Sequence, residues 1–409
     1  MKLPIASERL HDTFKSLENR NYRWFWLSAL AAFTSMQMQV FARGWLVYDL
    51  TGSSLALGWV SFAFGIPIML ISPLGGTVTD RVDKRNLLIT TQILAGVANL
   101  VIAVLISLGA IEVWHLMASA ALTGIIFAFN TPGRQSMIPE LVEREQLMNA
   151  IALSSGAMNL TRIFAPALAG ILVGIIGIDW VYYFTVICFG VAAAFLFMIP
   201  PLGKPIRDAT STMKTEVIEG FNYVRRSPIL LALLTLAFVP IVFGMPYQML
   251  MPAFAVEVLD AGASGLGFLM AAIGIGALFG SLSIATLGNF KHKGMLLYGA
   301  LIVFGAFLIG FAGSSNFYLS LFLLLGLGAA STSYMATNNT MIQLNVADGM
   351  RGRVMGIYMV TIGLFPLGVL PVGAIAEFLG AQLAVGVSGA FLILFTIAMA
   401  LLRPSLRKL

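Results

Sequence analysis

This sequence has few of the residues that build water-exposed surfaces, metal sites or catalytic centres. Only 10% of its 409 residues are charged, and it has one cysteine and three histidines. A soluble domain has about 25% charged residues, so the charge here is too sparse to cover a water-facing surface. A single cysteine excludes an intrachain disulfide and a thiolate metal cluster, and the histidines lack metal-ligand spacing. We therefore predict no enzyme activity, no metal and no cofactor.

Apolar residues make up most of the chain, at 59% against about 45–50% in soluble domains. The surface that charge does not cover must therefore face lipid. A helix needs about 20 mostly apolar residues to cross a bilayer, and the apolar runs lack the alternation of a membrane β-barrel. We predict an all-α membrane protein with twelve transmembrane helices, over residues 23–48, 55–75, 87–109, 113–133, 148–176, 179–200, 229–256, 265–287, 295–313, 317–338, 353–376 and 380–402.

The basic residues indicate how these spans are oriented. All of the 24 Lys and Arg residues except Arg43 and Arg162 lie in the terminal segments, in the loops after spans 2, 4, 6, 8 and 10, or at the first position of a span that follows them. Cytoplasmic loops carry the excess of Lys and Arg in membrane proteins. We therefore expect a multi-pass plasma-membrane protein with both termini cytoplasmic. The same distribution accounts for the net charge of +6 without a nucleic-acid partner.

The chain contains an internal repeat. Its two halves align through pairs that keep the same order: Gln39 with Gln248, Gly58 with Gly267, Lys84 with Lys293 and Gly124 with Gly328. Six spans separate the copies, and because that number is even both halves have the same orientation. Parallel six-helix repeats occur in transporters that bind substrate near the midplane between the halves. We predict two pseudo-symmetric six-helix bundles.

Polar segments divide the chain into five parts. Pro200 ends the first bundle and Pro228 begins the second. Between them Val217, Phe221 and Val224 repeat at helical spacing among charges, which indicates an amphipathic helix on the membrane surface. The predicted parts are a cytoplasmic N-terminal segment (1–22), the first bundle (23–200), a cytoplasmic linker (201–228), the second bundle (229–402) and a cytoplasmic tail (403–409).

The loop after span 2 carries a family signature. Its pattern G-x-x-x-D-R-x-G-R-R is matched at Gly76, Asp80, Arg81, Lys84 and Arg85, while Asp83 replaces the second Gly. This loop resembles that of the major facilitator superfamily. Residues 50–54 (LTGSS), 132–135 (PGRQ), 162–170 (RIFAPALAG) and 219–228 (EGFNYVRRSP) are similar to the branch that contains enterobactin exporters and macrolide-efflux proteins. The resemblance covers nearly the whole chain and implies the major facilitator fold.

In that superfamily the loop forms a cytoplasmic gate, which the resemblance assigns to Gly76, Asp80, Arg81 and Arg85. A carboxylate at position 80 beside a helix N-terminus of the other half would be stabilised by the helix dipole. The two arginines are expected to pair with acidic groups across the seam. The alternative is that these charges only set the topology. The antiporter signature of the superfamily is incomplete, because Ala165 stands where its first glycine is expected before Pro166.

Polar residues inside the spans are the candidates for a substrate site. Among charged residues only Arg43 and Arg162 are expected well inside a span, where an Arg costs about 2.5–3.5 kcal/mol and should face protein or water. Ser28, Ser35, Gln39 and Arg43 follow one stripe of span 1. The resemblance implies a central cavity lined by spans 1, 4, 7 and 10. The predicted cavity contains Gln39, Arg43, Asn130, Asn159, Arg162, Tyr247, Gln248, Tyr334 and Asn338. The alternatives are that polar residues only link helices and that Arg43 extends to the outer surface.

Flanking residues indicate the kind of substrate and coupling. Thioethers adapt to irregular apolar ligands, and five methionines flank the polar set: Met36, Met38, Met245, Met249 and Met251. Two arginines without an acid inside the spans favour an anionic, bulky and amphipathic ligand. Asp49 and Glu257 lie near the outer ends, at nearly equivalent places in the two halves, and are the candidate proton carriers. The alternative is that they are interface residues.

The residues and the resemblance together predict a secondary active transporter. It is expected to work as a monomer by alternating access and to export a small amphipathic compound, such as a drug or a siderophore, in exchange for protons. The export direction follows from the resemblance. Its expected partners are the small-molecule substrate, the lipid bilayer and protons. The alternatives are a lysophospholipid flippase and a non-transporting membrane sensor or assembly protein.

Overall fold

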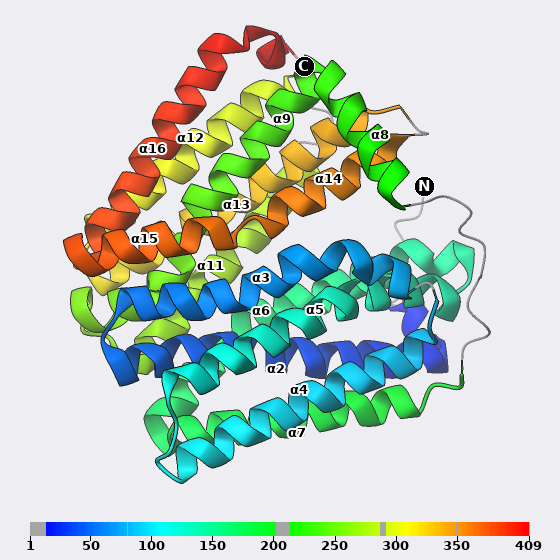
Figure 1. The fold of residues 1–409 in the computed structure, drawn as a ribbon, viewed down its shortest axis with the longest axis vertical. Helices are drawn as coiled ribbons and strands as arrows, with labels where there is room; N and C mark the ends of the chain where they lie inside the picture. The colour runs from blue at the N-terminus through cyan, green and yellow to red at the C-terminus, as the bar shows by residue number, and fades with distance from the viewer. Residues whose placement is uncertain (1–13, 80, 202–212, 287–291, 348–349, 409) are drawn as a thin grey trace, which may run out of the picture.

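The structure, a computed structural model, describes residues 14–79, 81–201, 213–286, 292–347 and 350–408, and every regular element in them is helical (Figure 1). The first group of helices is α2 (Arg20–Thr51), α3 (Ser54–Thr79), α4 (Lys84–Ser107), α5 (Val113–Leu141), α6 (Leu147–Ile176) and α7 (Ile178–Phe197). Short 3-10 helices η1 (Lys15–Glu18) and η2 (Arg144–Gln146) precede α2 and α6. We call α2 to α7 the N-terminal group.

The second group begins after α8 (Met213–Arg226). We call the elements from α9 to α16 the C-terminal group. They are α9 (Pro228–Val239), the π and 3-10 segments η3 (Pro240–Gly244) and η4 (Met245–Leu250), α10 (Met251–Ala253), η5 (Phe254–Val258), α11 (Gly262–Thr286), α12 (Lys293–Ala312), α13 (Phe317–Leu344), α14 (Arg351–Gly363), α15 (Pro366–Leu379) and α16 (Ala381–Leu402). A 3-10 turn, η7 (Pro404–Lys408), follows.

Local sequence determines where several helices begin and end. Asn19 caps α2 by accepting hydrogen bonds from the backbone N–H groups of Asn21 and Tyr22. Asp83 caps α4, its Oδ1 lying 2.8 Å from the backbone nitrogen of Asn86. Side-chain caps of this kind satisfy helix N–H groups that have no partner within the helix. The capping role explains why an Asp occupies the position where the loop signature has a glycine.

Eleven of the described helices or continuous helical runs are long and apolar enough to cross a membrane. The expectation of an all-helical membrane protein is confirmed for the described residues. The 32-residue helix α2 is not among the eleven, because polar residues such as Arg23, Gln39 and Arg43 are spread along it. Helix α5 continues to Leu141, eight residues beyond the predicted end at residue 133. Pro132 and Gly133 therefore do not end this helix.

Two of the predicted spans are not continuous α-helices. The run from Pro228 to Val258 contains π and 3-10 turns around Pro240, Pro246 and Pro252. Proline removes a backbone donor and clashes with the preceding turn, so these residues loosen the helix. The span predicted over 353–376 is divided where α14 ends at Gly363 and α15 begins at Pro366. This second break was not predicted.

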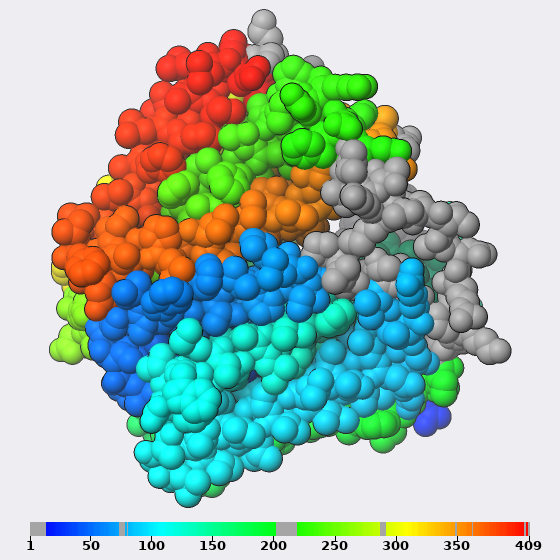
Figure 2. All heavy atoms as spheres, viewed as in Figure 1, coloured from blue at the N-terminus to red at the C-terminus, as the bar shows by residue number. Residues whose placement is uncertain are grey.

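The two groups meet along a seam formed by two helix pairs, α6 with α11 and α3 with α15. Figure 1 shows α3 running alongside α15, and Figure 2 shows their side chains in contact on the surface. Within the N-terminal group α2 packs on α6 and α7, and within the C-terminal group α12 packs on α13 and α16. We call the end of the helices that carries Lys84, Arg144 and Arg225 the basic end, and the end that carries Gly52, Gly177 and Gly380 the opposite end.

Glycines allow a very close approach of the groups near the opposite end. A Cβ placed on Gly267 of α11 would lie 2.6 Å from the Pro166 carbonyl oxygen of α6, and one on Gly170 would lie 2.6 Å from the Ala263 carbonyl oxygen. In the other pair, a Cβ on Gly373 of α15 would lie 3.5 Å from the Cα of Gly58. Small residues at helix interfaces permit such packing in membranes, where van der Waals contact drives association.

Toward the basic end the same helix faces lose contact. The α6–α11 contact extends to Gly274, which approaches the Arg162 carbonyl oxygen, but Leu278, one turn further along α11, is exposed. In the other pair Gly363 of α14 reaches Met69, whereas Met359 is exposed and a Cβ on Gly356 would meet nothing within 4 Å. Figure 1 shows the groups diverging toward the side where α8 lies. For the described residues, the seam is closed at the opposite end and open at the basic end.

We expect Gly267→Leu to disrupt the α6–α11 crossing, because its side chain has no space against the Pro166 carbonyl. Overpacking of this kind typically costs about 1–3 kcal/mol. The melting temperature of purified protein in detergent should fall. Gly190→Leu in α7 is the matched control, since a Cβ there meets nothing within 4 Å. Equal melting temperatures for the two variants would show that the crossing is not tight.

Candidate functional site

The polar stripe of α2 faces the interior of the N-terminal group. The Gln39 side-chain amide donates to the Thr123 hydroxyl of α5 at 3.3 Å, and Ser35 donates to the Thr185 carbonyl oxygen of α7 at 3.2 Å. The side of α2 that meets the C-terminal group instead carries Gly44, which lies next to Pro252. The stripe identified from spacing therefore links α2 to α5 and α7.

Arg43 belongs to this buried stripe. It is 7% exposed, its guanidinium lies 5.2 Å from the centre of the Phe64 ring, and its Nη1 has no hydrogen-bond partner. The aromatic face provides a favourable contact for a desolvated cation. Arg43 therefore does not extend to the outer surface, which was one of the alternatives.

A third arginine lies inside a helix of the N-terminal group. Arg134 is 6% exposed because α5 continues past Gly133, so the expectation that only Arg43 and Arg162 lie inside spans is wrong. Its Nε donates to the Asn130 side-chain oxygen at 3.0 Å, and Asn130 donates to the Thr91 hydroxyl at 2.8 Å. Both terminal nitrogens lack partners. The guanidinium instead lies 5.8 Å and 5.6 Å from the ring centres of Phe25 and Phe33.

Arg162 lies at the seam where the two groups separate. Its side chain is exposed, on the side of α6 opposite the exposed apolar stripe of Leu160, Phe164 and Leu168. At 100° per residue, positions 160, 164 and 168 share one face, and position 162 lies on the other. The backbone of Arg162 lies at the α6–α11 crossing, where a Cβ on Gly274 would be 3.1 Å from its carbonyl oxygen. Arg162 is therefore directed toward the other group and away from lipid.

Gln248 reaches the same seam from the C-terminal group. It is exposed among buried neighbours, and it lies one turn before Pro252, which contacts Gly44 of α2. Its amide donates to the Met245 sulfur at 3.8 Å. Arg162 and Gln248 are the two predicted cavity residues that the structure exposes toward the space between the groups.

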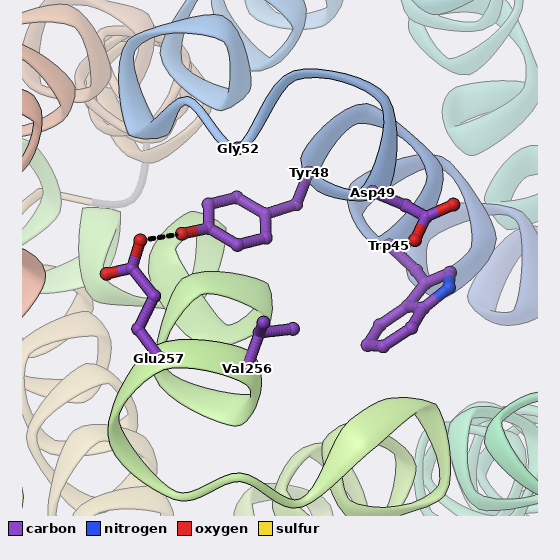
Figure 3. Close-up of a pocket in the computed structure, with 6 residues that line it drawn as sticks. All are labelled: Trp45, Tyr48, Asp49, Gly52, Val256 and Glu257. Atoms are coloured by element: carbon purple, nitrogen blue, oxygen red, sulfur yellow. Dashed lines mark hydrogen bonds between the residues drawn. The ribbon is translucent and has the colours of Figure 1, made fainter.

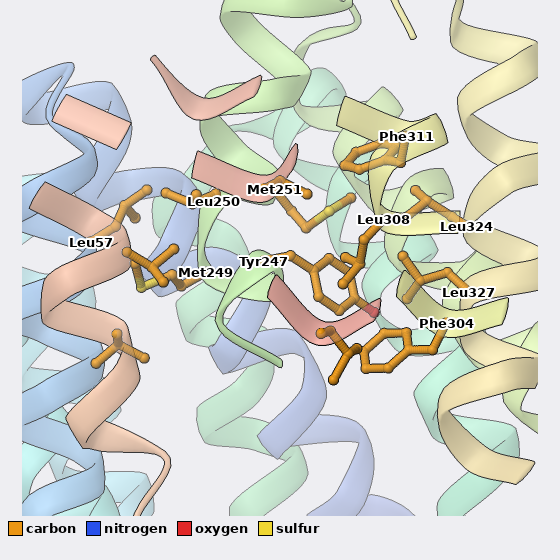
Figure 4. Close-up of a cluster of buried hydrophobic side chains, with 14 of the residues drawn as sticks. Leu57, Tyr247, Met249, Leu250, Met251, Phe304, Leu308, Phe311, Leu324 and Leu327 are labelled. Carbon is orange, nitrogen blue, oxygen red and sulfur yellow. The ribbon is translucent and has the colours of Figure 1, made fainter. Parts of the chain in front are cut away.

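The other predicted cavity residues lie deeper within one group. Tyr247, Tyr334 and Asn338 are buried in the C-terminal group, and the Tyr334 ring lies 6.3 Å from that of Phe304. Figure 4 shows Tyr247 among Phe304, Leu308 and Leu327, with Met249 and Met251 nearby. The Tyr247 hydroxyl and both amide atoms of Asn338 have no partner. Asn159 of α6 is half-buried. A substrate cavity that includes these residues stays a prediction.

A pocket of about 320 Å³ opens at the opposite end of the seam (Figure 3). It contains both candidate proton carriers, and its lining consists of Trp45, Tyr48, Asp49 and Gly52 at the end of α2 with Val256 and Glu257 of η5. The Tyr48 hydroxyl donates a hydrogen bond to the Glu257 carboxylate across the seam. The repeat alignment that pairs Gln39 with Gln248 also pairs Tyr48 with Glu257. The sequence therefore contains a signal that could have predicted this contact.

A second carboxylate crosses the seam nearby. Oε2 of Glu377, near the end of α15, accepts hydrogen bonds from the Ser53 hydroxyl at 2.9 Å and the Leu55 backbone nitrogen at 3.1 Å. Nothing in the sequence pairs Glu377 with the start of α3, because the contact joins residues far apart in the chain.

Three of the predicted gate residues, Gly76, Arg81 and Arg85, lie at the basic end. Asp80 falls outside the described residues, Gly76 lies within α3, and Arg81 is exposed. Arg85 donates to the carbonyl oxygens of Leu196 at 3.2 Å and Phe197 at 3.1 Å, at the C-terminus of α7. A cation at this position satisfies helix carbonyls that have no partner within the helix. In this open arrangement the hydrogen bonds of Arg85 therefore lie within the N-terminal group.

Comparison with known proteins places the chain among transporters. A family model described as "Transmembrane secretion effector" matches residues 11–408. The chain is 27% identical to the staphyloferrin A transporter of Staphylococcus aureus over 367 residues, 88% of this chain and 90% of the relative. It is 23% identical to macrolide efflux protein A of Streptococcus pyogenes over 387 residues, 93% and 94% of the two chains. The crystal structure of the nucleoside transporter NupG superposes with a TM-score of 0.69 at 14% identity, covering 93% of this chain and 98% of that one.

We expect Arg134→Met to leave the protein at least as stable as the wild type, because it removes a buried charge that costs about 2.5–3.5 kcal/mol in a membrane. By contrast, Asn130→Ala should destabilise the protein by about 1–3 kcal/mol, since it leaves the Arg134 Nε and Thr91 without their partner. Melting temperatures in detergent test both. Asn159→Ala, at a half-buried amide of α6, is the control. A larger loss for Arg134→Met than for Asn130→Ala would mean that Arg134 serves the fold.

Proposed function

Because the chain belongs to the transmembrane secretion effector family of the major facilitator superfamily, we propose that it exports small anionic amphipathic molecules by alternating access. The related proteins are transporters and not enzymes, and two of them are a staphyloferrin A transporter and a macrolide efflux protein. The observation that carries the proposal is Arg162, a cation exposed on the seam-facing side of α6.

The proposed architecture has two six-span bundles. The proposal counts Pro228–Val258 and Arg351–Leu379 as one span each and adds the 32-residue helix α2 to the eleven candidate spans, which gives six spans in each group. The boundaries proposed are 1–22, 23–200, 201–228, 229–402 and 403–409. Helix α8 of the linker packs on α14, with an ion pair of 2.7 Å between Glu219 and Arg353. We propose that one such chain is the transporting unit.

The proposed orientation makes the basic end cytoplasmic, since Lys and Arg are concentrated there. In that orientation the described seam is open to the cytoplasm and closed toward the outside. An exporter must load its substrate from the cytoplasm, so this arrangement corresponds to the loading state. The gate residues Gly76, Asp80, Arg81 and Arg85 would then close the basic end in the alternate state.

An anionic substrate fits the distribution of charge in the N-terminal group. Arg43 and Arg134 are buried there and Arg162 is exposed at its seam. The described ion pairs, Lys84 with Glu140 and Arg353 with Glu219, lie near the basic end and do not involve these arginines. The two buried arginines lie in a low-dielectric region, where a positive charge attracts an anion more strongly than it would in water. Gln248 and Met245 offer polar and polarisable contacts from the opposing group.

We propose proton antiport as the energy source, with Asp49 and Glu257 as carriers. Both carboxylates line the same pocket at the closed end of the seam. The Glu257 partner, Tyr48, belongs to the other group. Opening this end must therefore change the surroundings of Glu257, which is what coupling of a proton site to the transport cycle requires.

Flux measurements on purified protein in sealed vesicles test the function. Net transport should appear for a carboxylate siderophore when a pH gradient is imposed, and it should fall when an ionophore collapses the gradient. A macrolide and a lysophospholipid complete the panel. Transport that ignores the gradient would remove the proton coupling, transport of lysolipid alone would favour the flippase, and binding without flux would favour a sensor.

We expect Arg162→Gln to raise the KM for a carboxylate substrate roughly tenfold, the loss that corresponds to about 1.4 kcal/mol of binding free energy. Loss of the guanidinium charge removes a charge-assisted hydrogen bond of comparable strength. Arg162→Lys retains the charge and should stay close to the wild type. An unchanged KM in Arg162→Gln contradicts the anionic-substrate proposal.

A further inference from the structure

Two carboxylates of the C-terminal group accept hydrogen bonds from the N-terminal group at the opposite end of the seam. Glu257 accepts from the Tyr48 hydroxyl, and Glu377 accepts from Ser53 and the Leu55 backbone. We infer that Glu257 and Glu377 are gating residues that form a two-point latch and keep this end closed. The inference rests on the proposed alternating access, because a latch has meaning only if this end opens.

The Glu377 contact caps a helix of the other group. Helix α3 begins at Ser54, and the Leu55 N–H that Glu377 accepts is one of the first-turn donors that lack a partner within the helix. A carboxylate here is also favoured by the positive end of the helix dipole. The Ser53 hydroxyl accepts a hydrogen bond from a second donor of the first turn, the Ala56 backbone N–H, at 3.1 Å. When the groups separate, α3 retains the Ser53 contact and loses the one from Glu377.

The Glu257 contact lies close to the point where the two halves meet. Tyr48 is buried, and its hydroxyl has Glu257 as its hydrogen-bond acceptor. Opening this end leaves that hydroxyl without its acceptor until water or another group replaces it. A buried donor that loses its partner disfavours the open state. The Glu257 and Glu377 contacts therefore both stabilise the closed state of this end.

The partners of the two carboxylates are uncharged donors. The hydrogen bonds go to a phenol, an alcohol and a backbone amide, and the further charged side chain lining the adjoining pocket is Asp49, itself acidic. Hydrogen bonds to a charged acceptor are roughly twice as strong as neutral ones. Replacement of Glu by Gln keeps an oxygen acceptor and removes the charge, so it should weaken the latch, and replacement by Ala should abolish it.

Spin-label distances across the seam test the latch in the full-length protein. In a Cys188→Ala background, labels at Leu108 and Tyr318 report the opposite end, and labels at Met148 and Leu344 report the basic end; all four side chains are exposed. The Glu257→Ala/Glu377→Ala variant should increase the population with a long 108–318 distance several-fold and shorten the 148–344 distance. Glu257→Gln/Glu377→Gln should give a smaller change in the same direction. This variant provides the test if the alanine variant fails to fold.

Asp179→Ala is the matched control, an acidic residue in the first turn of α7 at the same end. Its distance distributions should equal those of the wild type. Unchanged 108–318 distances in both glutamate double variants would overturn the latch. The distances report the seam whether or not any compound is transported, so a failure of the export proposal in the flux assay remains distinguishable from a failure of the latch.

Discussion

Close packing of the two groups at one end of the seam is the constraint on which the rest of the structure depends. In lipid, apolar surface gains little from burial between helices, so association depends on how closely backbones approach. Gly170 and Gly267 allow that approach in one helix pair, and Gly58 and Gly373 allow it in the other. The crossings fix where the groups touch. They thereby determine that Arg162 and Gln248, nearer the basic end, are exposed between the groups.

The two groups differ in charge although they are built on one repeat. The alignment that pairs Gly124 with Gly328 also pairs Arg134 with Asn338 and Asn130 with Tyr334. Arg134 and Asn338 are both buried, and both have polar atoms without a hydrogen-bond partner. Each group therefore buries an unpaired polar side chain at the equivalent position. Only the N-terminal group keeps a cation there, beside Phe25 and Phe33. If the chain exports an anion as proposed, this difference gives the substrate a cation from one group only.

The fold class was predictable from the sequence because it follows from composition, run length and the distribution of Lys and Arg. Details that depend on tertiary contacts were not. The predicted span ended at residue 133, yet α5 continues to Leu141, since Gly133 packs close to Leu88 and Arg134 bonds Asn130. The stripe of Ser28, Ser35, Gln39 and Arg43 was identified as one face of α2. Helical spacing determines which residues share a face but not the direction in which that face points, and this face points into the N-terminal group.

The repeat also explains a difference along α2 and the run Pro228–Val258. Equivalent residues of these two spans are hydrogen-bonded near the opposite end and are not hydrogen-bonded to each other nearer the basic end. In the proposed arrangement, two parallel halves are related by an axis along the membrane normal. Equivalent residues on the helices beside that axis would then approach each other only where the seam is closed. Tyr48 and Glu257 are equivalent and form a hydrogen bond near the opposite end. Gln39 and Gln248 are equivalent by the same alignment, yet Gln39 bonds Thr123 within its own group and Gln248 is exposed. The two groups therefore separate between the Tyr48–Glu257 pair and the Gln39–Gln248 pair. Any motion that opens the opposite end must first break the hydrogen bond between Tyr48 and Glu257.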